Sequence, residues 1–332
     1  MKNVLLHPYM KKLYLLILIL IVVVFAKAQP HHYSQFYNSE LKLNPALTGL
    51  LQEKWRVKDV FQYRSLHSGV KLRTNVVFAE YRWQFDKVKH SYGLVVEEKR
   101  NFFMGIGIVD ERRNSSVSSA KFASDYLSIA FHKKIGEKSS ISLGIQPGYE
   151  YGPNGNFFDM NAGLLFGNRE LFCWQEDQFF KYQIGIGMYH LFRDWGTQTG
   201  EIYFPSRQLQ VHGGMLLEPI EKFSFVPSFQ YIYDATNFYN IGFKTFFFPI
   251  VHYNNYDRAR VGLFYKNTGH LALSAGLRFY GGAKNTFSID CAAGYDFNMG
   301  FLGVDTKYKN GFELMLLITP LYKCWSIDRC GN

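Results

Sequence analysis

The chain has 332 residues and a formal charge of +10, with 47% hydrophobic, 18% aromatic and only 19% charged residues. This apolar and aromatic content excludes an intrinsically disordered chain. The chain has one long apolar run, which excludes a polytopic helical membrane protein, because each span of that class needs about 20 apolar residues. Two classes remain: a soluble β-rich protein, and an outer-membrane-type β-barrel whose apolar positions alternate with polar ones.

The first 28 residues have the pattern of a secretory signal peptide. Lys11 and Lys12 give a basic start, residues 13–26 are all apolar, and residues 26–28 read Ala-Lys-Ala, the form of a cleavage site. The apolar run is short for a transmembrane helix, which needs about 20 residues. We therefore expect residues 1–28 to be removed on export, which takes away four lysines and no acid and lowers the formal charge to +6.

The basic residues that remain are not arranged as nucleic-acid-binding proteins arrange theirs. Arg112-Arg113 and Lys133-Lys134 are short pairs, and we expect them in solvated turns. A nucleic-acid interface needs a basic stripe gathered on one face. No nucleic-acid partner is therefore expected.

Export also places the cysteines in an oxidising compartment. Cys324 and Cys330 lie six residues apart in a C-terminal tail over 321–332, where they could close a small disulfide loop. Alternatively, these two and the remaining Cys173 and Cys291 all stay reduced, and spacing alone leaves both alternatives open. No Cys-x-x-Cys or Cys/His spacing typical of zinc occurs, so no metal site and no cofactor is expected.

Two-residue alternation of apolar and polar positions dominates the chain from residue 55 to residue 320. In residues 141–151 the odd positions carry Ile, Leu, Ile, Pro, Tyr and Tyr, and the even positions carry Ser, Gly, Gln, Gly and Glu. The same alternation recurs in residues 158–167, 182–192, 223–233, 271–279 and 287–299. Such patterns indicate strands with one apolar and one polar face.

The length of these strands favours a membrane barrel. The alternating runs cover nine to thirteen residues, whereas strands of soluble sheets average about five or six and a tilted membrane strand needs about 9–11. Aromatic residues often lie near the strand ends, as in an interfacial girdle. We predict an all-β fold, an outer-membrane β-barrel of about 14 antiparallel strands over residues 55–320. A large soluble β-sandwich, whose strands also alternate, is the alternative.

Glycine motifs do not indicate a nucleotide-binding site. Residues 105–107 and 185–187 both read Gly-Ile-Gly, but neither has the third glycine nor the βαβ context of a dinucleotide-binding loop. Glycine on the inward face of a barrel strand explains both motifs. No Gly-x-Ser-x-Gly elbow of a serine hydrolase occurs either.

The titratable residues do not form a recognisable catalytic set. His190, His212 and His252 are scattered singly, and we expect structural roles for them. Asp290 and Asp296 share a strand face, but six residues of strand separate them by about 20 Å, too far for a carboxylate pair acting on one bond. Solvation in the barrel or pairing with Arg278 is the better explanation, and no catalytic residue and no enzymatic activity are predicted.

Residues 29–54 differ from the rest of the chain. Asn44-Pro45 and Thr48-Gly49 specify turns, while the aromatic residues before them favour burial. The segment is therefore expected to form an ordered N-terminal arm. It could simply pack on the first hairpin, or it could act as a plug or docking element at one mouth of the barrel.

This arm resembles the opening of the PorP/SprF family of Bacteroidetes outer-membrane proteins. In that family a stretch of the form Gln-Asp-Pro-x-Phe/Tyr-Ser-Gln-Phe follows the signal peptide, and Leu-Asn-Pro-Ala-x-Thr-Gly comes next. The aspartate of the first motif is absent here, and the tryptophan that usually follows the Tyr-Arg element at Tyr63-Arg64 is also missing. The match is carried by Pro30, Tyr33, Ser34, Gln35, Phe36, Leu43, Asn44, Pro45, Ala46, Thr48 and Gly49.

The resemblance implies a non-enzymatic outer-membrane component of the type IX secretion system, a family that also includes proteins of the gliding machinery. Its implied partners are outer-membrane lipid, periplasmic ring components of the system, and a secreted adhesin-like protein with a type B C-terminal domain. Its implied role is to help export or surface attachment of that protein. The alternative function is an outer-membrane channel for small hydrophobic or polar solutes, with the same arm as a hatch.

Overall fold

The computed structural model describes most of the chain between residues 36 and 320. The predicted signal peptide at 1–28, the motif residues Pro30 to Gln35 and the tail at 321–332, with Cys324 and Cys330, lie outside the described residues. The described ranges are 36–51, 54–66, 68–84, 87–91, 94–98, 102–116, 121–135, 139–152, 155–167, 180–192, 207–220, 223–233, 238–247, 259–281, 287–299 and 308–320.

Three short helical turns precede the strands: η1 (Phe36–Asn38), α2 (Glu40–Leu43) and η2 (Pro45–Leu47). No helix within the described ranges is long and apolar enough to cross a membrane. The rest of the described chain is almost entirely strand. The strands are β1 (Trp55–Leu66), β2 (Lys71–Gln84), β3 (Lys87–Ser91), β4 (Leu94–Glu98), β5 (Phe102–Ser115), β6 (Lys121–Ile135), β7 (Ser139–Gly152), β8 (Gly155–Gly167), β9 (Phe180–Tyr189), β10 (Gln208–Ile220), β11 (Phe223–Tyr233), β12 (Phe238–Phe247), β13 (Ala259–Lys266), β14 (His270–Gly281), β15 (Phe287–Asn298) and β16 (Tyr308–Pro320).

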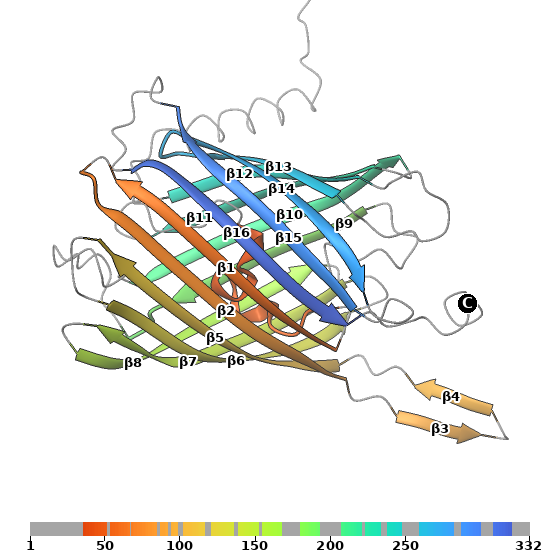
Figure 1. Ribbon diagram of the computed structural model, residues 1–332. Coiled ribbons are helices and arrows are strands. Elements are labelled where there is room, and N and C mark those ends of the chain that lie inside the picture. The colour runs from red at the N-terminus through yellow and green to blue at the C-terminus, as the bar shows by residue number, and fades with distance from the viewer. Residues whose placement is uncertain are drawn as a thin grey trace, which may run out of the picture.

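Fourteen of these strands close into one antiparallel barrel (Figure 1). Each barrel strand pairs with the next one along the chain, and β1 pairs with β16 to complete the ring. The short hairpin β3–β4 forms a separate sheet within the β2–β5 connection, and Figure 1 shows it projecting beyond one end of the barrel. The predicted all-β fold with about 14 antiparallel strands is confirmed. We call the end where β1 begins and β16 ends the terminal end, and the opposite one the far end.

The alternation in the sequence sorts side chains between the two faces of the wall. On β7, Leu143 is 56% exposed on the outside, whereas Ser142 is 1% and Gln146 0% exposed on the inside. Tyr149, near the end of the same strand, also faces outward. This apolar outer surface with aromatic residues toward the strand ends is what a barrel in lipid requires.

The basic pairs correct one expectation. Arg112-Arg113 lies in β5 and Lys133-Lys134 lies in β6, so neither pair forms a turn. These strands have 14 and 15 residues, whereas about 9–11 are enough to cross a membrane. The strand pairing therefore continues beyond the membrane-crossing part and includes the basic pairs. Arg112 is exposed there and pairs with Asp110 and Asp125 at 2.5 and 3.0 Å.

Candidate functional site

Residues 36–51 lie inside the barrel, and we call them the lumenal arm. The orange-red turns of this segment are visible within the ring of strands in Figure 1. Asn44, Ala46 and Thr48 are completely buried. Because a barrel strand buries only one face, the interior needs something else to fill it, and here the arm does so.

The Asn-Pro-Ala-x-Thr-Gly motif explains the local conformation of the arm. The Asn44 side chain accepts a hydrogen bond from Ala46 N at 2.9 Å and so caps η2, with Pro45 at the first turn, where its missing N–H costs nothing. At the other end, the Thr48 hydroxyl donates to the Pro45 carbonyl at 2.8 Å. Gly49 then turns the chain with a φ of +70°, a conformation that favours glycine.

The apolar residues of the arm form the largest part of one buried cluster. Phe36 packs edge-on against Phe264 of β13, with ring centroids 6.1 Å apart. Barrel residues from four strands complete the cluster. Its members are Phe36, Tyr37, Leu43, Ala46, Leu47, Leu50, Phe103, Leu165, Phe264 and Ala272. This hydrophobic cluster is therefore built around the arm.

The arm rests on four inward-facing glycines, which we call the glycine seat: Gly105, Gly144, Gly163 and Gly185. A Cβ atom on Gly105 of β5 would overlap the carbonyl group of Thr48, and one on Gly144 of β7 would overlap the backbone of Pro45. Gly163 of β8 and Gly185 of β9 bring the wall equally close to the Asn44 side chain. The prediction that these glycines face the interior is thus correct, and the structure adds the reason: the arm backbone occupies the space of a side chain.

Asn44 connects the arm to two neighbouring strands. Its side-chain nitrogen lies 3.0 Å from the Leu164 carbonyl oxygen of β8 and 3.3 Å from the Ile186 carbonyl oxygen of β9. The same nitrogen faces the ring of His212 on β10 at 3.1 Å. Because Asn44 is completely buried, replacing its amide by an apolar group would remove these wall contacts, and each lost hydrogen bond costs about 0.5–1.5 kcal/mol.

Charged residues attach the opposite side of the arm. Glu40 accepts hydrogen bonds from Lys58 of β1 at 2.6 and 2.7 Å, and it lies 3.4 Å from Arg56. Lys42 forms an ion pair with Glu111 of β5 at 2.7 Å. The Gly49 amide donates to a Glu80 oxygen of β2 at 2.6 Å. Polar contacts thus attach the arm to β1, β2 and β5 on one side and, through Asn44, to β8 and β9 on the other.

The electrostatic environment of Glu40 gives the attachment a pH dependence. Burial alone would raise the pKa of this carboxyl group, but the charges of Arg56 and Lys58 and the Lys58 hydrogen bond outweigh it and lower the pKa from 4.5 to about 2. A released arm would have the ordinary value. The ionised carboxylate therefore stabilises the docked arm fully above pH 4.5, and this contribution is lost as the pH falls toward 2.

Acidification from pH 6 to pH 2 is accordingly expected to loosen the arm and raise the ion conductance of the barrel in planar bilayers, with the change concentrated below pH 4.5. Glu40→Gln, which removes the titrating group, should show a higher conductance at pH 6 and a flatter profile. Identical profiles for the wild-type chain and Glu40→Gln would contradict the assignment.

The remaining predicted positions fall into clear groups. Phe36, Asn44, Pro45, Ala46, Thr48 and Gly49 all lie in the lumenal arm. Asp290 pairs with Arg278 at 3.1 Å, as expected, and also with Arg260 at 2.8 Å. Asp296 pairs with Lys266 at 2.6 Å. Cys291 forms no disulfide within the described residues, whereas Cys173 and His252 lie outside them.

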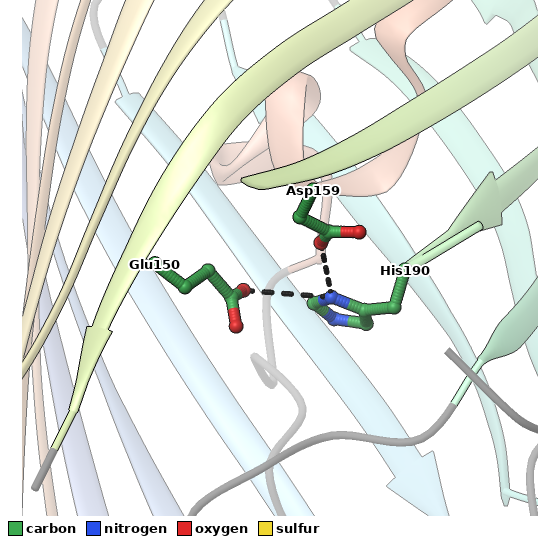
Figure 2. A group of neighbouring side chains, drawn as sticks. All are labelled: Glu150, Asp159 and His190. Atoms are coloured by element: carbon green, nitrogen blue, oxygen red, sulfur yellow. Dashed lines mark hydrogen bonds and ion pairs between the residues drawn. The ribbon is translucent and has the colours of Figure 1, made fainter. Parts of the chain in front are cut away.

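One group of residues was missed by sequence reasoning. His190 does not stand alone: Figure 2 shows it between the carboxylates of Glu150 and Asp159, and all three residues are buried. These residues lie 9 and 31 positions apart along the chain, so no spacing motif connects them. Only the pairing of β7, β8 and β9 brings them together.

Comparison with known proteins agrees with this architecture. Residues 25–152 match the sequence model of the family described as type IX secretion system membrane protein PorP/SprF, which confirms the resemblance seen in the N-terminal motifs. No curated protein matches the chain.

Several solved outer-membrane barrels are similar in structure. The CymD monoaromatic hydrocarbon channel is 8% identical with a TM-score of 0.50, covering 89% of this chain and 95% of its own. A deltaS2 mutant of the TodX monoaromatic hydrocarbon channel is 9% identical with a TM-score of 0.50, covering 90% and 98%. The toluene transporter TodX of Pseudomonas putida is 8% identical with a TM-score of 0.46, covering 90% and 96%. At such low identity the likeness to the two channels with a TM-score of 0.50 concerns the fold alone. The predicted outer-membrane localisation agrees with this barrel fold and with the family match.

Proposed function

We propose that this chain, whose residues 25–152 match the PorP/SprF family model, is a non-enzymatic component of the type IX secretion system. In this proposal it helps export or surface attachment of an adhesin-like protein that carries a type B C-terminal domain. Periplasmic ring components of the system are the partners on the other side of the membrane. The lumenal arm keeps the barrel closed while it does so.

The observation that carries the proposal is the identity of the residues that fill the lumen. The two motifs shared with the family end in the lumenal arm, and the second motif supplies the cap, the turn and the wall contacts that hold it. Because the arm is attached to β2, β5, β8 and β9 from inside the barrel, it supports a closed lumen rather than an open route for solutes. We therefore expect protein partners to bind at the two ends of the barrel.

Deletion of the gene in its own organism tests the proposal. We expect surface display of the adhesin-like protein to be lost and to return when the full chain is supplied again, measured by antibody labelling of intact cells. A chain lacking residues 36–51 should reach the outer membrane but restore display poorly, and membrane fractionation with heat-modifiable gel mobility shows that its barrel has formed.

The alternative channel function predicts a different pair of results. Display that is unchanged in the deletion strain, together with reduced uptake of a small hydrophobic or polar solute, would overturn the secretion proposal. Uptake that is unchanged, together with lost display, supports it. Purified wild-type protein in liposomes should accordingly pass such solutes no faster than protein-free liposomes.

A further inference from the structure

The buried group at the far end of the barrel has the composition of a metal site. Glu150 is near the end of β7, Asp159 is near the start of β8, and His190 follows β9 (Figure 2). One ligand atom from each residue lies within 4.8 Å of the other two. The His190 Nδ1 atom is 2.6 Å from Asp159 Oδ2 and 3.4 Å from Glu150 Oε1.

A fourth oxygen faces the same point. The Tyr126 hydroxyl of β6 lies 2.7 Å from Glu150 Oε1 and 3.0 Å from Asp159 Oδ2. A phenol has one proton, so it can donate fully to only one of these two acceptors. Asp159 is 0% exposed, and its Oδ1 atom has no hydrogen-bond partner among the residues that the structure describes. Asp159 therefore presents a buried carboxylate oxygen whose acceptor capacity is unused among the residues that the structure describes.

The backbone also directs His190 into this group. Its φ of 55° lies in the left-handed region, and it is the only such non-glycine residue within the described ranges. The His190 amide donates to Asn161 Oδ1 at 3.0 Å, and the Leu191 amide donates to the Met160 carbonyl at 3.0 Å. These contacts hold the turn after β9 against β8, so the imidazole is placed before any ligand binds.

We propose that Glu150, Asp159 and His190 bind a divalent transition-metal cation, with Zn²⁺ or Mn²⁺ as the class. Carboxylate oxygens combined with one imidazole nitrogen suit these ions, whereas Ca²⁺ and Mg²⁺ prefer sites made of oxygen alone. Binding requires a deprotonated Nδ1 atom and ionised carboxylates, so the cation takes the place of the protons that now connect the group.

The position of the site gives the cation a structural task. It connects the β7–β8 hairpin to the turn that begins the β9–β10 connection, and so fixes one part of the far-end rim. Tyr126 extends the link inward, because its ring packs in the cluster that contains Leu41 and lies 5.5 Å beneath the Lys42 ammonium group. A small pocket lined by Glu111, Arg113, Glu150 and Tyr151 provides access to the Glu150 side.

Metal content of the chelator-stripped, detergent-folded full chain tests the proposal. After incubation with Zn²⁺ or Mn²⁺ and desalting, elemental analysis should find one more equivalent bound to the wild-type chain than to His190→Asn. Asparagine tolerates the left-handed backbone at this position, so that variant keeps the turn. The midpoint of thermal unfolding should rise with Zn²⁺ for the wild-type chain only. The chain has ten histidines, and others among them can also bind Zn²⁺. The decisive result is therefore the difference in bound metal between the wild-type chain and the variant, not the total amount of metal bound.

Two further variants keep the test independent of folding. Glu150→Gln should weaken Zn²⁺ binding at least tenfold in titration calorimetry while heat-modifiable mobility shows a folded barrel. Asp290→Asn, which removes a buried carboxylate held by two arginines instead, should bind Zn²⁺ as the wild-type chain does. Equal binding by the wild-type chain, His190→Asn and Glu150→Gln would overturn the proposal, as would a thermal shift with Ca²⁺ or Mg²⁺ as large as with Zn²⁺.

Discussion

Adding one methyl group to each of two glycines is expected to release the lumenal arm. In Gly105→Ala/Gly144→Ala the new Cβ atoms would occupy the space of the Thr48 carbonyl group and the Pro45 backbone. Backbone atoms cannot move aside as a side-chain tip can, so the cost falls on the docking of the arm. Overpacking of this kind costs about 1–3 kcal/mol at each site, which shifts the docking equilibrium by roughly 5- to 150-fold for each substitution.

Two measurements report on the released arm. Ion conductance in planar bilayers should rise as the lumen opens, and trypsin should cleave after Lys42, whose side chain is only 12% exposed in the wild-type barrel. The matched control is Gly311→Ala on β16, where the added Cβ would meet Tyr63 and Arg64 of β1 but no arm residue. If the double variant has the same conductance and the same resistance to trypsin as Gly311→Ala, then Gly105 and Gly144 do not hold the arm in the lumen.

The second large effect is expected from Glu40→Gln. This substitution leaves the Lys58 ammonium group, which is only 3% exposed, without its carboxylate partner. Breaking a buried pair by removing one member costs about 3–5 kcal/mol, or roughly 150-fold or more in the docking equilibrium. Arg56 loses only its longer contact with Glu40, at 3.4 Å, and retains Glu80 at 2.5 Å, so the loss falls mainly on Lys58.

The double variant Glu40→Gln/Lys58→Met separates charge from shape. Removing both charges should recover most of the lost docking, because a neutral pair of similar volume needs no compensating ion. Conductance and tryptic cleavage after Lys42 again provide the readout. A double variant as open as Glu40→Gln alone would mean that the Glu40 side chain acts through its packing, not through its charge.

Much of the fold was predictable because strand alternation is a local property. The order of apolar and polar residues within each barrel strand indicates which face meets lipid. On β7, for example, the apolar Ile141, Leu143 and Ile145 face outward and Ser142 faces inward. The number of such runs and their length were enough to predict a barrel of about 14 strands. The turn chemistry of Asn44-Pro45 and Thr48-Gly49 is equally local, which is why an ordered arm was expected there.

The candidate site was less predictable because its contacts cross the lumen. Nothing in the sequence around Gly105 or Gly144 indicates that a backbone from residues 45–48 rests on them. The ion pairs of Glu40 with Lys58 and of Lys42 with Glu111 join segments 18 and 69 residues apart, and no periodicity relates them. Sequence reasoning therefore left open whether the arm packs on the first hairpin or plugs the barrel.

By itself the sequence determined that this chain is made of lipid-facing strands preceded by a structured segment, because both follow from the order of neighbouring residues. Only the tertiary structure decided that the segment lies inside the barrel, on a seat of glycines, and that His190 meets Glu150 and Asp159. Closure of the ring and the stagger between strands set which inward-facing residues come together. These are properties of the whole barrel, which no single strand contains.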